Sequence, residues 1–185
     1  MQLTNSPSRY GAVPQSVHWL TAVFVVVGWL IGQFGDVLPK GSARDTGLLV
    51  HMGLGQCVIV LLVFRVIWRL ANPPPPPEKT PLGRLLEIVA QVSHVTLYAL
   101  LITVPFLGII VQLKRAGELP LFGLWPLPSP WPVDRATSRT ILSLHGTLAD
   151  ALLILAFVHA SAALVLHHWI WRDRTLVRML PGVSR

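Results

Sequence analysis

The stretch RTILSLHGTLADALLILAFVHASAALVLHHWIW, from Arg139 to Trp171, decides the fold that the sequence predicts. We interpret it as one long helix that carries four of the seven histidines of the chain: His145, His159, His167 and His168. His145 and His159 are fourteen residues apart, which is about 21 Å along a helix and nearly four complete turns. Both side chains are therefore expected on one face of this helix, at two different depths.

The composition of the chain predicts a membrane protein rather than a soluble domain. Of its 185 residues, 52% are hydrophobic and 12% are charged, and the mean hydropathy is +0.59. Four runs without a charged residue are each long enough to cross about 30 Å of hydrocarbon as a helix: 10–35, 46–64, 88–113 and 151–171. We predict an all-α integral membrane four-helix bundle that forms one domain over residues 1–185. Its helices are expected over about 15–35, 45–70, 82–113 and 139–171.

The net charge of +7 comes from basic residues in short segments between these runs, which does not favour a nucleic-acid-binding protein. The charges bear instead on membrane orientation, because Lys and Arg are enriched on the cytoplasmic side. With the N-terminus inside, nine basic residues lie on the inner side (Arg9, Arg65, Arg69, Lys79, Arg84, Arg172, Arg174, Arg178 and Arg185) and six on the outer side (Lys40, Arg44, Lys114, Arg115, Arg135 and Arg139). This bias predicts an inside N-terminus.

Histidines match in depth as two pairs. The second and fourth helices both start at the outer side, so His51 and His145 come to a similar depth. His18 enters from the inner side, and His159 is the histidine best placed to meet it. Polar side chains are costly in hydrocarbon and are rarely left without a partner there. Interior histidines that only form hydrogen bonds are the alternative explanation.

Haem iron is the metal that these pairs fit best, because neutral imidazole is a common haem ligand. A structural zinc site needs four ligands, and each pair supplies two. Cys57 is the only cysteine, so the chain lacks the Cys-x-x-Cys-His motif of covalent haem attachment. The sequence therefore predicts two non-covalent haem b groups, each with two histidine ligands.

The function of each of the other polar residues within the predicted helices has two possible interpretations. His94, in the third helix, belongs to a quinone site or the inner haem pocket, or is a hydrogen-bonded interior histidine. His167 and His168, with Trp169, contact quinone or a haem propionate at the inner interface, or are simply exposed. Arg65 binds an inner haem propionate or extends to the inner surface. Asp150 accepts a hydrogen bond within the bundle, which we favour, or relays protons.

The longest loop, 114–138, contains five prolines and two tryptophans and is expected to form an ordered cap on the outer surface. Four cations flank it and are candidates for steering an anionic substrate, or are ordinary interface-anchoring residues: Lys114, Arg115, Arg135 and Arg139. Five consecutive prolines within 72–81 predict a stiff spacer at the inner face, in preference to a site for a proline-binding partner.

Several motifs resemble the bacterial branch of the cytochrome b-561 family: Ser16-Val17-His18-Trp19-Leu20, His51-x-Gly53-x-Gly55, Leu144-His145-Gly146-Thr147-Leu148-Ala149, His159 with Leu166-His167-His168-Trp169, and the 171–181 tail. The resemblance implies a four-helix di-haem cytochrome of the bacterial inner membrane. It implies His18–His159 and His51–His145 as the axial pairs. A characterised member oxidises superoxide at the outer face and reduces ubiquinone. Asp150 stands where the family leads us to expect a neutral amide, and the outer loop is idiosyncratic, which leaves the outer substrate open.

We therefore expect a superoxide:ubiquinone oxidoreductase whose partners are membrane lipid, quinone, and superoxide or a redox protein donor. The alternative is a non-catalytic electron-transfer or anchor subunit for a dehydrogenase or hydrogenase. A transporter is less consistent with the sequence, because the spans lack the pair of broken helices typical of that class.

Overall fold

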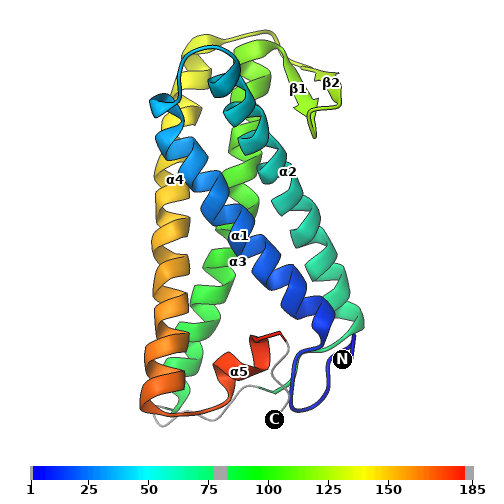
Figure 1. Ribbon diagram of the computed structural model, residues 1–185, viewed down its shortest axis with the longest axis vertical. Helices are drawn as coiled ribbons and strands as arrows, with labels where there is room; N and C mark the ends of the chain where they lie inside the picture. Colours follow the sequence, from blue (N-terminus) through cyan, green and yellow to red (C-terminus); the bar gives the residue numbers. More distant parts are fainter. Residues whose placement is uncertain (1, 77–82, 182–185) are drawn as a thin grey trace.

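Four long helices form the protein in the computed structural model, which describes residues 2–76 and 83–181 (Figure 1). They are α1 (Ala12–Phe34), α2 (Ser42–Ala71), α3 (Gly83–Ala116) and α4 (Arg135–Ser161). Within the described residues, these four are long and apolar enough to cross a membrane. The predicted all-α membrane four-helix bundle is confirmed, with helix boundaries within a few residues of those expected. Lys79, Arg185, the predicted helix start at Leu82 and residues 77–81 of the predicted proline spacer lie outside the described residues.

Local sequence explains where the helices begin and end. Gly41, with φ +98°, turns the chain into α2, and prolines from Pro73 onward follow its last turn. The Asp134 carboxylate caps α4 by accepting hydrogen bonds from the Ala136 and Thr137 N–H groups at 3.1 and 3.0 Å. A further hydrogen bond from the Thr137 hydroxyl is the main cause that lowers the pKa of Asp134. Asp134 therefore stays charged at neutral pH and fixes the start of the helix that carries His145 and His159.

The fourth helix is not one continuous α-helix, as the sequence predicted over 139–171. It is α-helical to Ser161 and continues as a π-helix over Ala162–Ile170. The Trp171 N–H then bonds to the Leu166 carbonyl, five residues back, at 2.8 Å. The wider turn rotates His167 and His168 away from the positions that an α-helix would give them. Hydrophobic spacing could not show this, because both helix types have a similar apolar face.

Helices adjacent in sequence pack most closely, α1 with α2 and α3 with α4. In Figure 1, α1 crosses the bundle diagonally in front of α3. Large apolar side chains point outward along the spans; Val60, Ile154 and Phe157 are 56%, 65% and 72% exposed. Such a surface is expected of helices that face lipid.

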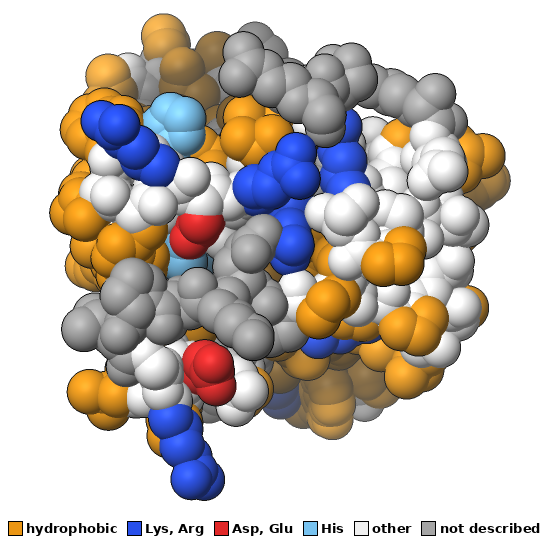
Figure 2. Space-filling model, turned by 90° about the horizontal axis from the view of Figure 1, so that it is seen from below, with side chains coloured by type: hydrophobic (Ala, Val, Ile, Leu, Met, Phe, Trp, Pro, Cys, Tyr) orange, Lys and Arg blue, Asp and Glu red, His pale blue; other side chains and the backbone are white. Residues whose placement is uncertain are grey.

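Both described ends of the chain lie at one end of the bundle, which we call the inner end after the predicted orientation (Figure 1). There α5 (Thr175–Met179) folds back against the start of α1. The Gln15 amide donates to the Arg178 carbonyl at 2.9 Å, and the Trp19 indole donates to the Met179 carbonyl at 2.8 Å. Figure 2 shows Lys and Arg side chains gathered on this face. The inside orientation of the N-terminus stays a prediction.

The opposite, outer end carries a β-hairpin that the sequence analysis did not predict. Strands β1 (Glu118–Leu121) and β2 (Trp125–Pro128) pair antiparallel, with Leu119 opposite Leu127. The loop returns to α3 where the Asp134 N–H bonds to the Lys114 carbonyl at 2.9 Å. The longest loop is therefore ordered, as expected, although its form differs from a simple cap.

Candidate functional site

The structure brings His51 of α2 and His145 of α4 together near the outer end. Their ring centroids are 6.0 Å apart and the ring planes are inclined at 79°. A metal–imidazole bond is about 2 Å long, so two imidazoles on one metal ion have ring centroids about 6 Å apart. The separation of these two rings fits one iron ion between them.

Both outer histidines are held in the tautomer that a metal needs. The His51 Nδ1–H donates to the Gly28 carbonyl at 2.8 Å, and the His145 Nδ1–H donates to the Val104 carbonyl at 2.9 Å. A carbonyl oxygen only accepts, so in each ring Nδ1 carries the proton and Nε2 keeps its lone pair. Backbone carbonyls orient metal-binding histidines in this way in many proteins.

Glycines make room for both rings. A Cβ atom at Gly32 would lie 3.0 Å from His51 Cε1, and one at Gly108 would lie 3.2 Å from His145 Cε1. Each glycine is four residues after the carbonyl that holds the ring, so the two histidines dock on α1 and α3 in the same manner. Sequence analysis missed Gly32 and Gly108. The spacing Gly28-x-x-x-Gly32 was the available indication for the first of them.

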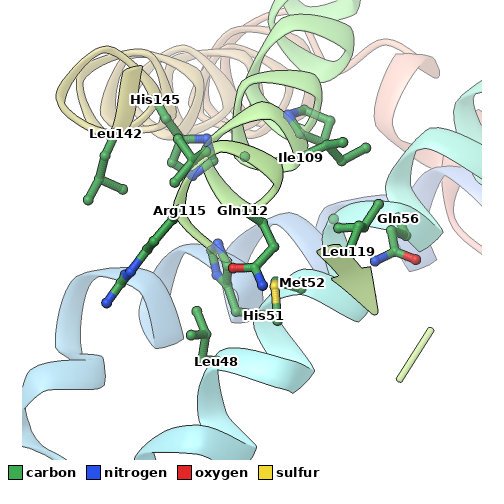
Figure 3. Close-up of a pocket in the computed structure, with 14 residues that line it drawn as sticks. Leu48, His51, Met52, Gln56, Ile109, Gln112, Arg115, Leu119, Leu142 and His145 are labelled. Atoms are coloured by element: carbon green, nitrogen blue, oxygen red, sulfur yellow. The ribbon is translucent and has the colours of Figure 1, made fainter. Parts of the chain in front are cut away.

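An outer cavity of about 110 Å³ lies between α2, α3 and α4 (Figure 3). In Figure 3, His51 and His145 approach it from different helices, with Gln112 and Arg115 beside them. Gly55 and Gly108 also line it, and the rest of the lining is largely apolar. This is the environment expected for a flat apolar cofactor with charged edge groups.

A second cluster lies nearer the inner end. The ring centroids of His18 and His159 are 6.5 Å apart, so the predicted inner pair also meets. His94 lies beside it, 5.3 Å from His159 between centroids. The Arg65 guanidinium lies over the Tyr98 ring at 5.4 Å, and its Nη1 is 3.5 Å from His18 Nδ1. Arg65 therefore points toward the inner pair, and His94 belongs to the same cluster.

Among the aromatic side chains of the described residues, two have a buried polar atom without a hydrogen-bond partner: Tyr98 Oη and Trp68 Nε1. Natural proteins rarely leave such groups unpaired, so a missing partner is the usual explanation. Tyr98 lies one helical turn after His94 on α3. Trp68 lies three residues after Arg65 on α2. Sequence analysis missed these two residues, although their helical spacing was visible.

The predicted quinone residues are divided between two places. His94 lies beside His159. His167 lies elsewhere, in the π-helix, and its Nδ1 is 2.6 Å from Oδ2 of Asp173, which belongs to the turn that follows this helix. Partial burial raises the pKa of Asp173, but hydrogen bonds from the Thr175 N–H and from His167 outweigh this and lower it overall. His168 is exposed, and Trp169 is 63% exposed.

The four outer cations are also not equivalent. Arg115 lines the outer cavity, and the Lys114 ammonium lies 5.6 Å from the centroid of the Trp131 ring. Arg135 and Arg139 are exposed in the first turns of α4. Between the two bundle ends, Asp150 accepts a hydrogen bond from the Trp29 indole at 2.8 Å, which confirms the prediction for this residue.

Comparison with known proteins identifies the family of this chain. The family model described as prokaryotic cytochrome b561 matches residues 9–182. The chain belongs to the bacterial cytochrome b561 family. The resemblance seen in the motifs is thus confirmed, and the chain is a multi-pass haem protein of the bacterial inner membrane that binds haem b and transfers electrons.

Relatives in this cytochrome family are similar over nearly their whole length. Cytochrome b561 homolog 2 of Escherichia coli (strain K12) is 31% identical over 187 residues, covering 100% of this chain and 97% of the relative. A protein of Yersinia pestis named probable superoxide oxidase CybB is 29% identical over 175 residues, covering 94% and 96%. Cytochrome b562 of Cereibacter sphaeroides is 26% identical over 183 residues, covering 96% and 98%.

Proposed function

We propose that this cytochrome binds two haem b groups and oxidises superoxide at its outer end while reducing ubiquinone at its inner end. The observation that carries the proposal is the pair of histidine sites, with ring separations of 6.0 and 6.5 Å. His51 and His145 are the proposed ligands of the outer haem, and His18 and His159 those of the inner one. When bound, each haem supplies a one-electron redox couple at its iron.

The chain itself controls the ligands. The Gly28 and Val104 carbonyls fix the Nδ1–H tautomer of His51 and His145, which leaves each Nε2 available to bind a metal. Arg65 lies beside His18, and Tyr98 lies against Arg65, so this part of the chain offers a cation and a hydrogen-bond donor, which suits the carboxylates of a haem. A positive charge near the inner site also favours the reduced state there, because reduction adds an electron.

The outer end is suited to a small anion. Arg115 lines the cavity that contains His51 and His145, so its charge attracts an anion toward the outer site. Superoxide is such an anion, and it gives up one electron to become dioxygen without moving a proton. The name of the Yersinia pestis relative supports this substrate.

The inner end must supply protons. Two superoxide ions deliver two electrons, and ubiquinone takes up two electrons and two protons to become ubiquinol, so the overall reaction is balanced. The hydrogen-bonded pair of His167 and Asp173 lies near the inner end and can hold and pass a proton. We assign the quinone site to the surroundings of His167, His168 and Trp169, with His94 toward the inner haem pocket.

The test is superoxide-driven reduction of ubiquinone by the purified, haem-loaded cytochrome in liposomes, followed by ubiquinol absorbance. We expect turnover that stops when superoxide dismutase is added. Haem that is reduced by dithionite and reoxidised by quinone, with no response to superoxide, would instead favour an electron-transfer subunit of a dehydrogenase or hydrogenase.

A further inference from the structure

The β-hairpin at the outer end has an unusually apolar surface. All four residues of β2 are exposed, and all four are apolar. Leu124 and Trp125 are each 70% exposed, Phe122 is 49% and Leu127 is 46% exposed. Glu118 is the only charged residue from 118 to 128. Such a protrusion is unfavourable in water and requires a covering surface.

The tip of the hairpin lies beside an apolar part of α2. A Cβ atom at Gly123 would be 3.4 Å from Leu49 Cδ2. The Gln56 amide holds the tip from below: its Oε1 accepts from the Phe122 N–H at 2.8 Å and its Nε2 donates to the Pro120 carbonyl at 3.0 Å. Leu49 and Gln56 both belong to the charge-free run 46–64. Figure 1 shows the hairpin leaving the upper end of α3 and pointing back along α2.

Few backbone N–H groups point outward from the two unpaired edges of the hairpin. Pro120 is paired with Pro126, and neither has an N–H, so this is a pair without ladder hydrogen bonds. Since such pairs alternate with bonded ones, Glu118 opposite Pro128 is of the same kind. The backbone groups of these four residues therefore point away from the partner strand. Three of the four are prolines, which leave no N–H to be paired there.

The outward carbonyls of β1 are paired as well. The Gln56 amide bonds to the Pro120 carbonyl, and the Gln112 amide donates to the Glu118 carbonyl at 3.3 Å. At the tip, the Leu124 N–H closes the turn on the Leu121 carbonyl at 2.9 Å. In lipid, each unpaired backbone group costs several kcal/mol, so the pairing of the β1 carbonyls lowers the cost of placing this strand at membrane depth.

We propose that the β1–β2 hairpin is a re-entrant element that inserts into the lipid leaflet at this end of the bundle. Its partner is the acyl-chain region of that leaflet, which covers Phe122, Leu124, Trp125 and Leu127. Gln56 and Gln112 clamp the hairpin to α2 and α3. Leu119, 3% exposed, lines the outer cavity, so the inserted hairpin also closes the cavity against lipid on the α2–α3 side. This inference does not rest on the proposed function.

The test is the reactivity of single cysteines with a charged, membrane-impermeant maleimide in liposomes, with reagent on both sides. All variants carry Cys57→Ser, and Leu124→Cys is compared with two controls, Val37→Cys and Val60→Cys. Val37 is 81% exposed in the turn before α2, and Val60 is 56% exposed midway along α2. Because maleimide needs a hydrated thiolate, we expect Leu124→Cys to react as slowly as Val60→Cys and about tenfold or more slower than Val37→Cys. All three must react fully in sodium dodecyl sulfate.

A reaction of Leu124→Cys as fast as that of Val37→Cys would place the hairpin in water and overturn the proposal. Protection that weakens when the lipid-to-protein ratio is raised tenfold would assign the covering surface to a second protein copy, and would also overturn it. In the clamp variant Gln56→Leu, we expect Leu124→Cys to react faster, whereas Gln33→Leu, the same exchange on α1, leaves the rate unchanged. If Gln56→Leu loses haem absorbance, Gln112→Leu provides the same measurement; an unchanged rate would refute the clamp.

Discussion

His51 and His145 lie with their ring centroids 6.0 Å apart, and each donates its Nδ1–H to a backbone carbonyl of the preceding helix. The two rings are thus oriented by main-chain atoms rather than by side chains. A carbonyl cannot titrate, so the orientation of both rings is independent of pH as long as the helices stay packed. For a haem site this means two ligands whose rings are oriented in the same way.

Removing one proposed ligand is expected to remove one haem. His51→Ala or His145→Ala should lose the outer haem, and His18→Ala or His159→Ala the inner one, because a single imidazole holds the iron much less tightly than two. A pyridine haemochrome assay should fall from two haems per chain to one. A wild-type value of one haem per chain would contradict the two-site assignment.

Gly32→Ala is expected to weaken the outer site. The new methyl group would lie 3.0 Å from His51 Cε1, and overpacking of this kind costs about 1–3 kcal/mol. That corresponds to roughly 5–150-fold weaker retention of the outer haem. Gly28→Ala on the same helix is the control, because its Cβ would meet Leu54 Cβ at an ordinary 4.0 Å. Haem transfer to apomyoglobin measures retention, and equal rates for the two variants would refute the packing argument.

Replacing Arg65 is expected to lower the potential of the inner haem. Arg65→Gln removes a cation that lies 3.5 Å from His18, and a positive charge favours the reduced iron. We expect a fall of about 50 mV in one of two redox transitions, since 59 mV is a tenfold change for one electron. Arg69→Gln, one turn further on, removes the same charge as a control. A redox titration in which both variants shift alike would argue against a specific role for Arg65.

Replacing both inner-end histidines is expected to slow electron transfer to quinone. His167→Leu with His168→Leu removes the partner of Asp173 and two polar groups beside Trp169. Reoxidation of the reduced cytochrome by ubiquinone, followed by stopped-flow absorbance, should slow by about tenfold or more if these groups pass protons. Both haem spectra should persist. Unchanged reoxidation would move the quinone site elsewhere, toward His94.

Salt and outer cations are expected to affect the superoxide rate together. The rate should fall as salt rises, because screening shortens to about 8 Å at physiological ionic strength. Arg115→Gln should lower it most, since Arg115 lines the outer cavity; Arg135→Gln with Arg139→Gln should have a smaller effect. Arg44→Gln is the control, because Arg44 is already paired with Asp36 at 3.2 Å. A rate indifferent to salt and to Arg115 would exclude steering.

Spacing and hydropathy were enough to predict the spans and the meeting of His51 with His145 and His18 with His159. These features depend on helix periodicity and on the alternating direction of successive spans, and both can be derived from the order of residues along the chain. The roles of Gly32 and Gly108 depend on which carbonyl each histidine contacts, and that is set by the rotation of neighbouring helices. Sequence patterns do not encode this rotation directly.

The hairpin and the π-helix were missed for other reasons. A stretch with prolines at 120, 126 and 128 reads as a loop, because prolines normally interrupt strands. Here they occupy only the positions that need no N–H, and Gln56, about sixty residues earlier, completes the pairing. The π-helix changes the backbone bonding of Ala162–Ile170 without changing its apolar pattern.

The docking of each outer histidine on the helix before its own also bears on how the protein is made. During synthesis α1 and α2 leave the ribosome before α3 and α4. The contact of His51 with Gly28 can therefore form while His145 is still untranslated, and α3 with α4 can repeat the step later. Each helical hairpin then enters the membrane with its ligand already oriented. On this view haem insertion is the last event of assembly, and the metal joins two halves that were completed separately.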